Sequence, residues 1–219
     1  MQHSNRELWL ALVMILLLTG GYLFVVNREA AIPAASSLYG HLIGVLGFIL
    51  MLMTETLYTL RKRTRSARWG RMASWLQFHI FTGIVGPYML LLHSSWKFNG
   101  LAGIALLLTV VIVISGFIGR YIYTSIPRTA DGIEIESAEL EMQIERLESE
   151  IHQRTQAGKR AIQQLNRQRQ ALQRQVRSLA MARRMLGLWH TVHIPIGLAL
   201  FAVAFIHAFA ALYYATLLH

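Results

Sequence analysis

The chain contains the stretch HIFTGIVGPYMLLLH at residues 79–93 and a second stretch, HIPIGLALFAVAFIH, at residues 193–207. Both begin and end with histidine, and neither carries a charged residue between its two histidines. Each lies in a longer apolar run of the length that crosses a hydrocarbon core, which takes about 20 helical residues. The two stretches therefore predict membrane helices that each carry histidine at two depths.

The remaining sequence supports a membrane protein. Of its 219 residues, 54% are hydrophobic and only 15% are charged, and the mean hydropathy is +0.42. A soluble domain carries about a quarter charged residues, so an ordinary soluble enzyme is not expected. Helices are expected because the hydrocarbon core contains no water that could form hydrogen bonds with unpaired backbone groups. We predict an all-α integral membrane bundle of five transmembrane helices, at roughly 8–26, 38–60, 73–93, 101–123 and 186–217.

The distribution of basic residues predicts the orientation. Of the 21 Lys and Arg residues, 19 fall on one side of the predicted membrane, and only Arg28 and Lys97 fall on the other. Because cytoplasmic loops are enriched in Lys and Arg, the N-terminus and the long segment before the fifth helix are expected in the cytoplasm, and the C-terminus outside. The net charge of +10 then reflects the orientation and contact with anionic lipid of an inner cell membrane. A nucleic-acid partner is not expected.

Three regions follow from this topology: residues 1–126 with four membrane helices, residues 127–185 in the cytoplasm, and residues 186–219 with the fifth helix. A continuous helix of 50 residues would end about 75 Å from its start, yet the chain must return to the membrane. An acidic arm and a basic arm therefore predict an antiparallel coiled-coil hairpin. The two heptad-like series are Leu140, Ile144, Leu147 and Ile151, and then Ile162, Leu165, Leu172, Val176 and Leu179. A structural spacer, a dimerisation interface of a homo-oligomer and a docking site for a redox partner protein remain open as its role.

The spacing of the histidines indicates a metal centre at each depth. Fourteen residues make nearly four helical turns, so both histidines of a stretch lie on one face, about 21 Å apart along the axis. The third and fifth helices run in the same direction, which places His79 and His193 at one level and His93 and His207 at the other. Facing imidazoles at equal depth suit the two axial positions of a haem iron, whereas zinc takes more protein ligands. Because the chain has no cysteine, two haems would be bound without covalent attachment.

The paired spacing resembles the di-haem core of ferric-reductase-like and NADPH-oxidase-like membrane cytochromes b. The segments WHTVHIP at 189–195 and GRYIY at 119–123 are also similar to bacterial b-type cytochrome subunits. The resemblance covers about half of the chain, from the third to the fifth helix. It implies two non-covalent haem b groups and electron transfer across the membrane. A dinucleotide-binding fingerprint is absent from the sequence, so electrons would enter from a quinol or from a separate protein.

Three further residues are secondary candidates for binding a cofactor. Arg120 is expected either to pair with a haem propionate or to anchor its helix at the cytoplasmic surface. His190 lies one turn before His193 and is expected to contact a propionate or to form an interfacial hydrogen bond. His41 lies at the level of His93 and His207, where a propionate, a quinone or the membrane interface could be its partner. A quinone is therefore a second candidate cofactor.

The function expected from these patterns is transmembrane electron transfer, by the cytochrome subunit of an oxidoreductase complex linked to quinol or to protein. Catalytic residues are not predicted, because two protein ligands on each iron leave no open position for a substrate. The alternative is a haem-free membrane scaffold or sensor that recruits a partner through the hairpin.

Overall fold

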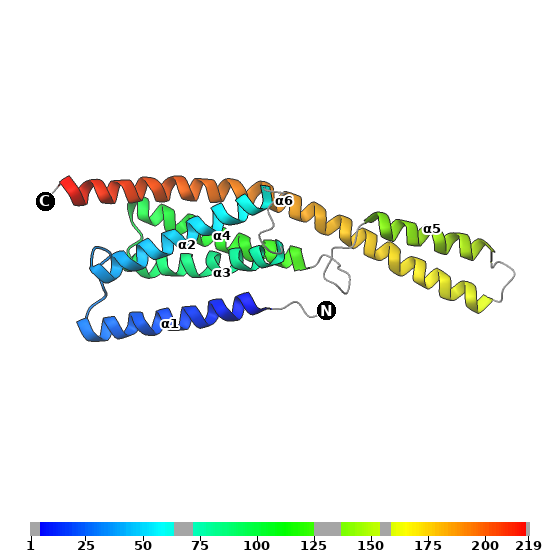
Figure 1. The fold of residues 1–219 in the computed structure, drawn as a ribbon, viewed down its shortest axis with the longest axis horizontal. Helices are drawn as coiled ribbons and strands as arrows, with labels where there is room; N and C mark the ends of the chain where they lie inside the picture. The colour runs from blue at the N-terminus through cyan, green and yellow to red at the C-terminus, as the bar shows by residue number, and fades with distance from the viewer. Residues whose placement is uncertain (1–4, 64–71, 125–136, 154–158, 218–219) are drawn as a thin grey trace. The chain divides into compact units, whose positions relative to one another are not determined.

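The computed structural model describes residues 5–63, 72–124, 137–153 and 159–217. In these ranges the chain is all-α, as predicted (Figure 1). The helices are α1 (Arg6–Glu29), α2 (Leu38–Arg63), α3 (Met72–His93), α4 (Gly100–Thr124), α5 (Ser137–Gln153) and α6 (Lys159–Leu217). The basic loop around 64–71, the expected linker within 125–136 and the expected turn at 154–158 lie outside the described residues.

Five of these helices are long and apolar enough to cross a membrane, in agreement with the five stretches expected from the sequence. They are α1, α2, α3, α4 and part of α6. Most of their large side chains are not covered by protein; the buried share of the apolar window is only 6% in α4 and 11% in α1. Apolar helix surface of this extent is consistent with a multi-pass membrane protein, whose lipid-facing side chains need no protein partner.

Helix α6 extends much further than the fifth apolar stretch. It contains 59 residues and includes both the basic segment from Lys159 and the apolar segment that ends at Leu217. The predicted boundary between residues 185 and 186 is therefore a change of composition within one helix. Gly187 and Pro195 disfavour helix near this boundary, yet the helix continues through both. Apolar helices tolerate such residues when neighbouring groups satisfy the freed backbone atoms.

Two compact units make up the chain, and each is described separately. The first, here called the α5 unit, is Phe117–Val192. The second, here called the histidine unit, consists of Gln2–Gly116 and His193–His219.

In the α5 unit, α5 and the first part of α6 pack through apolar side chains. Leu140 of α5 is buried with Leu179 and Ala182 of α6. Farther along α5, the Glu148 carboxylate lies 3.5 Å from the Arg169 guanidinium. A later residue of α5 thus meets an earlier residue of α6, so the two segments run in opposite directions. The apolar residues Leu172, Val176 and Leu186 pack against this cluster.

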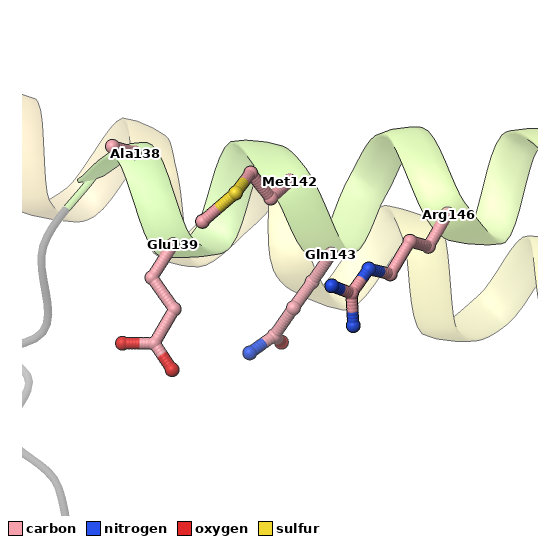
Figure 2. A pocket seen from close by; sticks show the side chains of 5 residues that line it. All are labelled: Ala138, Glu139, Met142, Gln143 and Arg146. Atoms are coloured by element: carbon pink, nitrogen blue, oxygen red, sulfur yellow. The ribbon is translucent and has the colours of Figure 1, made fainter.

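The exposed surface of α5 carries a shallow depression of about 430 Å³. Figure 2 shows the side chains that line it, which are Ala138, Glu139, Met142, Gln143 and Arg146. They alternate between charged, polar and apolar groups within three turns of one helix. This pattern is typical of a solvated helix face, and the lining residues include none of the candidate histidines.

The α5 unit is expected to depend on its apolar contacts far more than on its ion pair. Leu179 is 1% exposed, so Leu179→Ala should cost about 2–5 kcal/mol of local stability. Glu148→Gln should cost less than about 1 kcal/mol, because both partners of the ion pair are partly exposed to solvent. Hydrogen exchange of the α5 backbone amides in the full-length protein measures both effects. Equal acceleration of exchange in the two variants would contradict this ranking.

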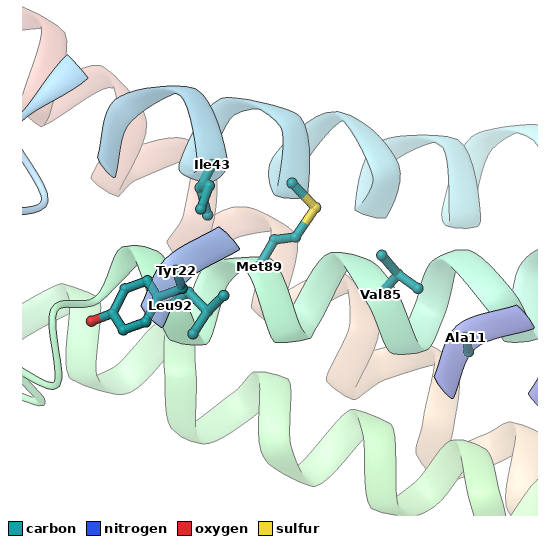
Figure 3. Close-up of a cluster of buried hydrophobic side chains, with 6 residues drawn as sticks. All are labelled: Ala11, Tyr22, Ile43, Val85, Met89 and Leu92. Carbon is teal, nitrogen blue, oxygen red and sulfur yellow. The ribbon is translucent and has the colours of Figure 1, made fainter. Parts of the chain in front are cut away.

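The core of the histidine unit is centred on α3. Val85, Met89 and Leu92 of α3 are buried between Ala11 and Tyr22 of α1 and Ile43 of α2 (Figure 3). Helices α2 and α3 approach most closely at Gly47 and Gly86, where a Cβ on either glycine would lie 3.1 Å from the carbonyl oxygen of the other. Small residues at helix crossings allow such approach in membranes. This crossing brings the α3 histidines against the backbone of α2.

Candidate functional site

His79 is held by α2. Its Nδ1 lies 3.0 Å from the carbonyl oxygen of Thr54. A carbonyl can only accept a hydrogen bond, so Nδ1 must carry the proton and the ring's lone pair is on Nε2. The Thr54 hydroxyl lies 2.7 Å from that of Thr82, which is fully buried one turn after His79. These contacts fix the ring orientation of His79 relative to α2.

His93 is held by the same helix near its other end. Its Nδ1 donates to the carbonyl oxygen of Gly40 at 2.8 Å, which gives the same tautomer as in His79. One turn further along α2, the His93 ring packs directly on Gly44. A Cβ at Gly44 would lie 2.7 Å from Nδ1 and 2.8 Å from both Cε1 and Cγ of the ring. Only glycine leaves room for the imidazole in this position.

His193 is held by α4 rather than α2. Its Nδ1 lies 3.0 Å from the hydroxyl oxygen of Ser115. One turn further along α6, a Cβ on Gly197 would make an ordinary van der Waals contact, at 3.9 Å, with Cδ1 of Ile112 on α4. The contact to His193 thus comes from a side chain, whereas His79 and His93 bond to backbone carbonyls.

His93 interacts electrostatically with His207 of α6 and with His41 of α2. The ring of Phe205, two residues before His207, meets Phe48 of α2 edge-on, with centroids 5.3 Å apart. Helices α3 and α6 therefore each carry a histidine that takes part in this electrostatic interaction. The pairing of His93 with His207 stays a prediction.

The remaining candidates, His190 and Arg120, belong to the α5 unit. His190 Nδ1 donates to the Leu186 carbonyl of its own helix at 2.8 Å. The His190 ring packs edge-on against the Trp189 ring, with centroids 4.7 Å apart. The Trp189 indole occupies the space beside Gly119, where a Cβ would collide with it. The next residue, Arg120, has its Nε buried. The two segments that resemble b-type subunits thus meet at this tryptophan–glycine contact.

Four residues at the site are not evident from the sequence alone. They are Gly40, Gly44, Thr54 and Ser115, which acquire a role only through their contacts with the histidines. The spacing of Gly40, Gly44 and Gly47 marks a face of close approach on α2, but it does not reveal which side chain fills that face. A serine in an apolar helix usually bonds to its own backbone, so its sequence position gives no indication of a histidine partner.

These residues fit a haem iron chemically. A bis-histidine centre needs one Nε2 lone pair from each of two rings, and a bond from Nδ1 to an oxygen is the usual way to orient such a ligand. Among the described residues no three His, Cys, Asp or Glu side chains form a group that could hold a metal ion. A bis-histidine centre would need only two histidines.

Comparisons of this chain with protein-family models, curated proteins and solved structures give no match.

Proposed function

We propose that this chain is a membrane cytochrome b that transfers electrons across the bilayer through two bis-histidine haems. His79 and His193 would hold one haem, and His93 and His207 the other. The observation that carries the proposal is that three of these four histidines have Nδ1 at hydrogen-bonding distance from an oxygen on a neighbouring helix. In that tautomer Nε2 is the ligating nitrogen.

The neighbouring helices prepare these rings before any ligand binds. Helix α2 orients both α3 histidines through carbonyl oxygens, and α4 orients His193 through Ser115. A ring that is already oriented loses little freedom on ligation, which strengthens binding. When bound, a haem supplies an iron that takes up and releases single electrons, and two imidazoles leave it no position for substrate.

An electrostatic interaction between His93 and His207, one from each quoted stretch, supports pairing across α3 and α6. A separation of 14 residues along each helix then puts the second pair about 21 Å away, close to the distance across most of the hydrocarbon core. His41, His190 and Arg120 are proposed as contacts to propionates, with a quinone as a further partner for His41.

The proposed topology places the N-terminus and the α5 segment in the cytoplasm and the C-terminus outside an inner cell membrane, on the basis of the asymmetry of Lys and Arg. Helix α5 and the basic part of α6 are proposed to form an antiparallel coiled-coil hairpin. Electrons would be exchanged with a quinol or with separate redox proteins, so the chain would act as one subunit of an oxidoreductase.

An absorption spectrum of the purified protein tests this function directly. The expected result is a red protein whose dithionite-reduced spectrum has the sharp Soret and α bands of low-spin haem b. The pyridine haemochrome assay should find two haems per chain. A colourless protein, purified from cells with ample haem, would contradict the proposal and favour the haem-free scaffold or sensor.

A further inference from the structure

Ser115 of α4 contacts His193 in a way that differs from the contacts of the other oriented histidines. Its hydroxyl oxygen lies 3.0 Å from His193 Nδ1, whereas His79 and His93 bond to backbone carbonyls. We propose that Ser115 is a positioning residue that orients His193 and lowers the reduction potential of the haem held by His79 and His193. This inference rests on the proposed function.

The local structure gives Ser115 a role beyond capping its own helix. Some hydroxyls in the apolar helices bond only to their own backbone in the described contacts, as Thr109 does to the Ala105 carbonyl at 2.7 Å. The Ser115 hydroxyl instead lies within hydrogen-bonding distance of His193 on α6. A polar group in an apolar environment costs free energy unless it has a hydrogen-bond partner. The bond between Ser115 and His193 therefore avoids this cost for both side chains.

With Nε2 of His193 as the iron ligand, Nδ1 carries the proton and would donate to the Ser115 hydroxyl oxygen, 3.0 Å away. A hydrogen bond to an acceptor makes the imidazole a stronger electron donor to its metal, which favours the oxidised iron. Reduction of that iron then becomes harder, and its potential falls. Removal of the Ser115 hydroxyl should therefore raise the potential of one haem and leave the other unchanged.

The test compares Ser115→Ala and Ser115→Thr with Thr109→Val, which removes a buried hydroxyl from the same helix away from His193. Potentiometric titration followed by absorbance gives the midpoint potentials of both haems in each variant. The expected result is a higher potential for a single haem in Ser115→Ala, with wild-type potentials in Ser115→Thr and Thr109→Val. Repeating Ser115→Ala in a His207→Ala background, which should retain only the affected haem, identifies which potential has moved.

The outcomes separate this inference from the proposed function. Unchanged potentials in Ser115→Ala would overturn the role of Ser115 while leaving the cytochrome intact. Equal shifts of both haems, or the same shift in Thr109→Val, would also overturn it, because they would indicate a general loosening of α4. A wild-type protein without haem would overturn the proposed function and this inference together.

Discussion

Replacing His93 or His207 with alanine should remove one haem, and replacing His79 or His193 should remove the other. The reason is that an iron with two imidazole ligands loses its low-spin coordination when either ring is deleted, and a membrane interior offers no equivalent substitute. The pyridine haemochrome assay should fall from two haems per chain to one in each variant. The reduced spectra of His93→Ala and His207→Ala should be identical to each other and different from those of the second pair.

Two further histidines serve as controls for this pairing. His41→Ala and His190→Ala should each retain both haems, because neither residue is one of the four proposed iron ligands. The pairing is wrong if one member of a pair can be replaced with both haems retained. Loss of a haem in His190→Ala but not in His193→Ala would instead show that His190 is the ligand, one turn from the position proposed.

The five apolar helices could be predicted from the sequence because lipid imposes a minimum length and excludes charge over that length. The continuity of α6 could not be predicted in this way. Its first part, from Lys159, is rich in basic and polar residues, and its second part is apolar. Such a difference indicates whether a segment faces water or lipid, but it does not indicate where a helix ends. Gly187 and Pro195 follow this change and disfavour helix, so neither composition nor propensity indicates that the helix continues through them.

The candidate ligands could be predicted from the sequence for a similar reason, since periodicity alone places His79 and His93 on one face. Their orientation depends on neighbours that are distant in the chain. Gly40 precedes His93 by 53 residues, and Ser115 precedes His193 by 78. A single sequence carries no information on such contacts, because many glycines and serines in apolar helices serve only packing.

The Gly44→Ala substitution should remove the haem held by His93 and His207 although it changes no ligand. Its added methyl group would lie 2.7 Å from Nδ1 and 2.8 Å from Cγ of the His93 ring. Rotation of the ring about its bond to Cβ leaves Cγ in place, so the whole side chain must swing away or the helices must separate. Either movement breaks the bond to the Gly40 carbonyl, and overpacking of this kind typically costs about 1–3 kcal/mol.

Gly20→Ala provides the matched control, because a Cβ at Gly20 of α1 meets no atom within 4 Å. Alanine stabilises a helix by about 0.5–1 kcal/mol relative to glycine, so a loss in Gly44→Ala cannot come from the backbone. The expected haem content is one per chain for Gly44→Ala and two for Gly20→Ala, with the Gly44→Ala spectrum matching that of His93→Ala. Two haems in Gly44→Ala would show that the His93 ring does not need the space above this glycine. A spectrum matching that of His79→Ala would instead assign the glycine to the opposite pair.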